Sequence, residues 1–231
     1  YAQTTGDYSS AYGWYAKAEG QNSAAYGSHA HASADFSSAY GWYANAEGDQ
    51  SSAYGSEANA TGDYSSAYGC GARATGWGSS AYGNGAWAAA QYSSAYGVEA
   101  QAAAESSAAY GNKAQATGKF STASGYKAQA TGNYSSAYGN GAQATALSSS
   151  AYGYSAIASA DFSAAYGSGA KATVAYGVAL GTGSTADRQT TVTGVYVPTG
   201  ASSTAVNNTV KGNMGIASIG DTYVTRQLAG V

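Results

Sequence analysis

A 14-residue repeat governs most of this chain and continues without an insertion or a deletion. A glycine recurs twelve times at this spacing, from Gly13 to Gly167, and tyrosine precedes it in every turn but one, where Ser124 stands instead. Alanine follows each of these glycines at three and at five positions, and serine occupies the tenth position from Ser23 to Ser163. Equal units of this kind stack on one another in solenoid proteins, so the repeat predicts a rod.

The pattern within each unit predicts two short strands and two corners. Small and variable residues alternate over five positions, which is the period of a strand. Glycine, or alanine in its place, recurs at a second fixed position seven residues after the first, and both positions predict corners. Stacked units of this kind form a parallel β-solenoid with rungs about 4.8 Å apart, so twelve rungs extend for roughly 55–60 Å.

The alanine columns predict the cross-section of this coil. Strands of about four or five residues leave room only for small side chains between two walls. We expect the alanines after each glycine, such as Ala16 and Ala18, to form one wall, and the alanine before each tyrosine, such as Ala25, to form the other. Strict alternation then turns the neighbouring tyrosine out of the roll.

The column of outward tyrosines predicts self-association. An alanine core buries little apolar area against about 1–2 kcal/mol of backbone entropy per residue. A tyrosine can bury about 150–250 Å², and a long exposed aromatic stripe usually marks an interface. We therefore expect rolls to associate through the serine- and tyrosine-bearing wall, with tyrosine hydroxyls bonded to one another, to serines or to trapped water. The alternative is a monomeric roll that uses the stripe as a solvent-exposed binding site. The predicted interface consists of Tyr12, Tyr26, Tyr40, Tyr54, Tyr68, Tyr82, Tyr96, Tyr110, Tyr138, Tyr152 and Tyr166.

Composition excludes several other classes of function. A formal net charge of −3 argues against a nucleic-acid partner, because binding of that kind needs a basic face. No stretch of 18 apolar residues occurs, so we expect no membrane contact by this segment. The single cysteine, Cys70, rules out an internal disulfide framework, and we interpret it as a tolerated corner substitution. The chain has no recognisable nucleophile–base pair, hexapeptide period or calcium-binding nonapeptide, so we predict neither catalysis nor a cofactor.

The repeat resembles the head of the trimeric autotransporter adhesins, the YadA-like head. That family repeats Asn-Ser-Val-Ala-Ile-Gly-x-x-Ala-x-Ala-x-Gly over 14 residues, and residues 65–69 followed by Ala72, Ala74 and Gly76 match this frame with tyrosine in place of isoleucine. Residues 174–177 and 178–181 come closer still to the family wording, and residues 226–231 resemble the start of the family's neck.

The resemblance implies an all-β fold, a left-handed parallel β-roll assembled as a homotrimer. It also implies exposure at the cell surface, from the outer membrane of a Gram-negative bacterium. The implied partners are host extracellular matrix, a host cell-surface receptor or other bacteria. Since tyrosine replaces isoleucine, the trimer interface is expected to be aromatic and polar rather than aliphatic.

Three segments are expected along the chain. Residues 1–186 form the roll, and residues 187–213 interrupt the repeat with an inserted β-hairpin-like segment. Within it, residues 189–197 are rich in β-branched residues and predict a strand, and Pro198 opens a turn. Residues 214–231 are expected to supply the last head strand, around 213–219, and the start of the neck.

Candidate ligand-binding residues lie outside the repeat's structural columns. Exposed tyrosine and tryptophan offer large contacts at low entropic cost, so aromatic residues in the N-terminal half are the leading candidates. They are Trp14, Tyr15, Trp42, Tyr43, Trp77 and Trp87. We interpret the recurring corner aspartates as solvated, and we expect no calcium row.

Two histidines have a spacing that suits a metal pair. His29 and His31 are two residues apart, which places them on one face of a predicted strand. No carboxylate or thiol is expected beside them, and Lys17 in the next rung opposes a cation. We therefore predict no metal site.

Three functions compete on this reading. The adhesive head displays polar and aromatic columns to a partner, many copies at a time. A structural spacer or biofilm matrix solenoid would share the rod but have no receptor. An ice-binding solenoid would need a flat face with one regular motif, whereas the outer columns here are mixed in charge and size.

Overall fold

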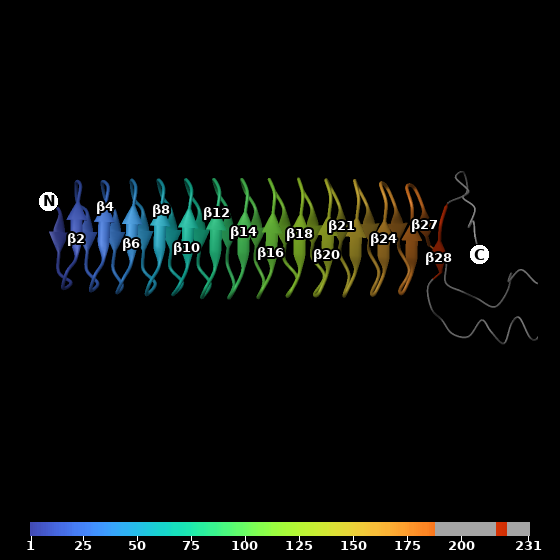
Figure 1. Cartoon of the computed structure of the whole chain (residues 1–231), viewed down its shortest axis with the longest axis horizontal. Coiled ribbons are helices and arrows are strands. Elements are labelled where there is room, and N and C mark those ends of the chain that lie inside the picture. The colour runs from blue at the N-terminus through green and yellow to red at the C-terminus, as the bar shows by residue number, and fades with distance from the viewer. Residues whose placement is uncertain (188–215, 221–231) are drawn as a thin grey trace, which may run out of the picture.

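The computed structural model describes residues 1–187 and 216–220, and these form a parallel β-solenoid (Figure 1). The coil consists of two parallel sheets of 14 strands each, and no helix occurs among the described residues. The odd-numbered strands make one sheet and the even-numbered strands make the other. An all-β parallel solenoid is therefore confirmed.

The strands are two or three residues long, shorter than predicted, because three-residue corners flank them on both sides. The odd-numbered sheet contains β1 (Gln3–Thr4), β3 (Lys17–Ala18), β5 (His31–Ala32), β7 (Asn45–Ala46), β9 (Asn59–Ala60), β11 (Arg73–Ala74), β13 (Trp87–Ala88), β15 (Gln101–Ala102), β17 (Gln115–Ala116), β19 (Gln129–Ala130), β21 (Gln143–Ala144), β23 (Ile157–Ala158), β25 (Lys171–Ala172) and β27 (Thr185–Ala186). The even-numbered sheet contains β2 (Ser10–Tyr12), β4 (Ala24–Tyr26), β6 (Ser38–Tyr40), β8 (Ser52–Tyr54), β10 (Ser66–Tyr68), β12 (Ser80–Tyr82), β14 (Ser94–Tyr96), β16 (Ala108–Tyr110), β18 (Thr122–Ser124), β20 (Ser136–Tyr138), β22 (Ser150–Tyr152), β24 (Ala164–Tyr166), β26 (Val178–Leu180) and β28 (Ala217–Ser218).

The register of both sheets equals the sequence repeat. Strand β10 pairs with β12 so that Ala67 stands beside Ala81 and Tyr68 beside Tyr82, which are 14 residues apart. The same offset joins Ala74 of β11 to Ala88 of β13 in the other sheet. Every position of the repeat therefore becomes a straight column along the rod, as the constant period predicts.

The core consists of the predicted alanine walls. Alanines from both sheets, such as Ala67 and Ala74, are completely buried along the coil. A column of serines, which the sequence analysis left unplaced, is buried with them from Ser23 to Ser163. Several of these serines donate a hydrogen bond back to the second corner, as Ser93 Oγ does to the Ala90 carbonyl at 2.6 Å. The core is thus a narrow stack of methyl and hydroxymethyl groups.

The first corner comprises the repeat glycine and the two residues after it, and it requires glycine for two reasons. At Gly97 the φ angle is +138°, a conformation that L side chains rarely adopt. A Cβ placed there would also lie 2.5 Å from the Gly111 carbonyl oxygen of the next rung. The predicted corner role of this glycine column is confirmed.

The end of the coil resumes beyond the masking of the repeat. Strand β28 lies within the stretch predicted as a strand around residues 213–219 and pairs in parallel with β26, with Ala217 beside Val178. Residues 178–181 follow the repeat frame, whereas residues 174–177, which have similar letters, occupy the second corner, where Tyr176 has a φ of +58°. The predicted strand at 189–197, the turn at Pro198 and the neck start at 226–231 lie outside the described residues.

Candidate binding surfaces

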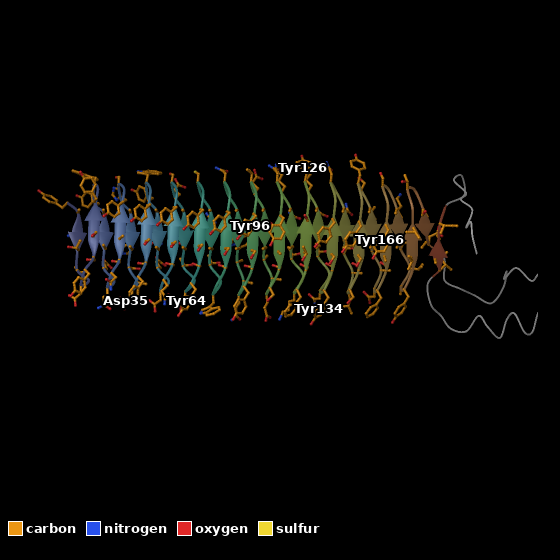
Figure 2. The ribbon with its side chains drawn as sticks, in the orientation of Figure 1. Asp35, Tyr64, Tyr96, Tyr126, Tyr134 and Tyr166 are labelled. Atoms are coloured by element: carbon orange, nitrogen blue, oxygen red, sulfur yellow. The ribbon has the colours of Figure 1, made fainter. Side chains whose placement is uncertain are left out.

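The outer face of the even-numbered sheet carries parallel columns of serine and tyrosine, and we call it the tyrosine face (Figure 2, where Tyr96 and Tyr166 are labelled). Successive rings stack nearly parallel, with centroids 4.7 Å apart between Tyr40 and Tyr54 and an interplanar angle of 4°. The stack continues to Tyr110 and resumes after Ser124, which has no ring. The structure therefore brings the predicted interface tyrosines onto one face.

Hydrogen bonding and burial differ along this stack. Burial raises the pKa of Tyr68 above the ordinary value, and the neighbouring Tyr54 and Tyr82 hydroxyls raise it further. A hydrogen bond shared with the Ser52 side chain works in the opposite direction. Of the partners left open by the sequence, serine thus serves at this tyrosine within a single chain.

The first corner carries an aromatic cluster near the N-terminus. The His29 ring is stacked between Tyr15 and Tyr43, with centroid distances of 5.4 and 4.5 Å. Trp14 and Trp42 contact these tyrosines edge to face, at 5.1 and 4.5 Å. Trp14 remains 63% exposed. Four of the six predicted binding residues therefore form one patch, and His29 belongs to it.

The other two predicted residues lie elsewhere. Trp77 is in the second corner, which comprises the residues seven to nine positions after the repeat glycine, and it contacts Tyr64 and Tyr92. Trp87 lies on β13, on the outer side of the odd-numbered sheet. Figure 2 shows that the two corners form opposite edges of the rod, with Tyr126 on one edge and Tyr64 on the other. The six residues consequently span three separate surfaces.

The second corner carries a further aromatic column that the sequence analysis overlooked. Its last position is aromatic in every second rung over the first two thirds of the rod, and we call this set the aromatic edge. It consists of Tyr8, Phe36, Tyr64, Tyr92 and Phe120. All five side chains are exposed, Phe36 to 55%. The signal that identifies them is a 28-residue period, twice the structural repeat.

These aromatic residues occupy a backbone conformation that disfavours them. Their φ angles lie between +54° and +58°, in the left-handed region where a non-glycine residue costs about 1–2 kcal/mol. The conformation turns each N–H toward the preceding rung, as in the 2.8 Å bond from the Tyr64 N–H to the Asp49 carbonyl. Glycine or asparagine suits this position better, and Asn22 and Gly78 occupy it in intervening rungs. Exposed rings kept at such a cost point to a role outside folding.

Acidic side chains line the same edge. The Asp35 carboxylate accepts a 2.7 Å hydrogen bond from the Gln21 N–H of the preceding rung, and Asp63 does the same for Asp49 at 3.0 Å. These carboxylates occupy the solvated corner positions expected for them, and two of them also cap backbone N–H groups. They give this edge a negative potential.

The histidine pair is arranged differently from the prediction. His29 lies in the first corner with a φ of +59°, and only His31 belongs to a strand, because the corner begins directly before it. The expectation that both share a strand face was wrong, and so was the absence of a nearby carboxylate, since His31 Nε2 lies 3.2 Å from Glu19. No group of three potential metal ligands occurs within residues 1–187 and 216–220. Cys70 is exposed at a first corner.

Comparison with known proteins identifies the repeat. The YadA head domain repeat matches residues 18–44, 46–72 and 116–142. No curated protein matches the chain. Within the described part of the chain, no helix has the length and apolar character needed to cross a membrane. The matched segments cover the stacked rungs that the structure describes, so this β-solenoid is a YadA-like head domain of the kind found in trimeric autotransporter adhesins, an adhesin family rather than an enzyme family.

Proposed function

We propose that this chain is the adhesive head of a trimeric autotransporter, exposed from the outer membrane of a Gram-negative bacterium. The match to YadA head domain repeats is the observation that carries this proposal. The head attaches the cell to host extracellular matrix, to host cell-surface receptors or to other bacteria. Many copies on one cell turn weak individual contacts into firm attachment.

In the proposed assembly three chains join through the tyrosine face. This face presents a flat, regular row of stacked rings, and seven tyrosines stack without a break from Tyr26 to Tyr110 by way of contacts between successive rungs. An exposed aromatic surface of this length favours burial against another copy, because each tyrosine can bury about 150–250 Å². The rolls are left-handed in this proposal, residues 187–213 form an insertion, and residues 214–231 lead into the neck.

Receptor binding is proposed at exposed aromatic side chains away from that face. The first-corner patch supports this assignment, because Trp14, Tyr15, Trp42 and Tyr43 lie together and remain exposed. Large rigid aromatic side chains lose little entropy on binding. Trp77 and Trp87 offer additional contacts on the other surfaces.

The test is attachment of the purified head to immobilised collagen, fibronectin, epithelial cells and partner bacteria. A variant with Trp14→Ser, Tyr15→Asn, Trp42→Ser and Tyr43→Asn removes the patch, and asparagine suits the positive φ at residues 15 and 43. A Trp87→Gln variant serves as the matched control, because glutamine follows it in the same column at Gln101. Saturable attachment that the patch variant loses supports the proposal. A head that binds none of these surfaces identifies a structural spacer instead.

Ice binding is the second candidate, and the tyrosine face is the observation that favours it. The outer columns are mixed elsewhere, but this face repeats one serine and tyrosine motif at a constant interval along most of the rod. It remains free for ice only if the chain is a monomer. Thermal hysteresis in a nanolitre osmometer would identify this activity, and its absence at millimolar protein would eliminate it.

A further inference from the structure

The aromatic edge has a regular spacing along the rod. Its rings recur every 28 residues from Tyr8 to Phe120, which corresponds to two rungs, or about 9.6 Å. The intervening rungs carry small or polar residues at the same position, among them Asn22 and Ser106. Alternation of this kind produces separate aromatic platforms, in contrast to the continuous stack on the tyrosine face.

Small residues in the intervening rungs make room for the rings. A Cβ added at Gly78 would lie 3.4 Å from Tyr92 Cδ1, so the Tyr92 ring rests against the backbone of the preceding rung. Trp77 lies between two platforms, with its ring centroid 5.3 Å from that of Tyr64 and 5.0 Å from that of Tyr92. More than half of the Tyr92 side chain remains exposed and available to a ligand.

A polysaccharide has the chemistry and the repeat length that this edge suits. The C–H face of a pyranose ring packs on an aromatic side chain, which combines a large contact area with little loss of entropy. In an extended 1,4-linked chain the same pyranose face recurs at every second sugar, an interval close to the two-rung spacing. A row of platforms therefore binds several sugars of one chain at once.

Charge selects among polysaccharides. Asp35, Asp49 and Asp63 lie beside the rings, and these exposed carboxylates accept hydrogen bonds from sugar hydroxyls. The cation at the second-corner positions between residues 7 and 120 is Lys119, which is paired with Glu105 at 3.3 Å. An edge of this charge repels anionic polysaccharides.

We propose that the aromatic edge binds an extended, uncharged, 1,4-linked polysaccharide on the surface to which the head attaches. This inference rests on the proposed adhesive function and specifies a ligand class and an edge for it. The edge differs from the first-corner patch, which lies on the opposite side of the rod.

The experiment is electrophoresis of the native protein through gels that contain a soluble polysaccharide. Hydroxyethylcellulose is the uncharged extended probe, carboxymethylcellulose its anionic counterpart, and dextran a flexible chain with a different linkage. The edge variant combines Phe36→Asn, Tyr64→Asn, Tyr92→Asn and Phe120→Asn, because asparagine adopts the same conformation at Asn22. The control variant combines Tyr15→Asn and Tyr43→Asn on the opposite edge. Circular dichroism establishes that both variants remain folded.

Hydroxyethylcellulose should retard the wild-type protein and the control variant, and carboxymethylcellulose and dextran should have little effect. The apparent affinity of the edge variant should fall about tenfold or more. The inference is overturned if hydroxyethylcellulose leaves the wild-type protein unretarded, or if it retards the edge variant equally. Attachment to matrix proteins and cells, measured in parallel, separates the two proposals: attachment without retardation removes this inference alone, and retardation without attachment supports it while the protein-receptor proposal fails.

Discussion

Replacing Gly97 with alanine tests how closely the rungs are stacked. The substitution forces alanine into a φ of +138° and places its Cβ 2.5 Å from the Gly111 carbonyl oxygen. The conformation costs about 1–3 kcal/mol, and relief of the overlap by separating two rungs costs about 1–3 kcal/mol more. We expect Gly97→Ala to lower the free energy of unfolding by about 2–6 kcal/mol.

A second glycine of the first corner provides the matched control. Gly85 has a φ of +63°, and a Cβ there would meet nothing closer than Glu99 Cγ at 3.7 Å. Side chains occupy the same column in other rungs, for example at Lys113. Gly85→Ala should therefore cost only about 1 kcal/mol.

The assay is urea unfolding followed by circular dichroism, with both variants at the same protein concentration. Close backbone stacking predicts a clearly larger loss of stability for Gly97→Ala than for Gly85→Ala. Equal losses, within about 0.5 kcal/mol, would refute the reasoning, because the two sites would then differ only in conformation and not in the approach of the next rung.

Three further substitutions probe the core, the tyrosine face and the acidic edge. Ser93→Ala removes a buried hydrogen bond and should cost about 1 kcal/mol in urea unfolding, whereas Ser65→Ala should cost less, because the Ser65 hydroxyl has no partner among the described residues. The pKa of Tyr68 is raised, so its contribution to stability is fully present below the ordinary value of 10.0 and is lost as pH rises through the higher folded value. Tyr68→Phe should reduce this alkaline loss, which unfolding at a series of pH values measures. Asp35→Ala should cost about 0.5–1 kcal/mol through the Gln21 N–H, and Asp35→Asn, which keeps the acceptor, should restore it.

The repeat alone was sufficient to predict the columns of this fold. A constant period of 14 residues places Ala67 beside Ala81, and alternation within a strand then decides that Tyr68 faces outward. These two rules suffice because each rung contacts its immediate neighbours, so local spacing determines the long-range structure.

The corners could not be predicted in the same way. His29 adopts a positive φ because its N–H must reach the Trp14 carbonyl of the preceding rung at 2.7 Å, and a histidine reveals nothing of that need in the sequence. The strand prediction for His29 failed for this reason. Trp77 and Trp87 appeared to belong with the first-corner aromatics, but a displacement of a few residues along a short coil carries a side chain to another surface.

Sedimentation equilibrium of this segment tests the central claim most directly, because the trimer depends on the tyrosine face. The account predicts a folded species with the mass of three 22.9 kDa chains, and it predicts that serine substitutions at Tyr54, Tyr68 and Tyr82 weaken this association. A stable, folded monomer at the same concentrations would contradict the account, and the tyrosine face would then be a solvent-exposed binding surface.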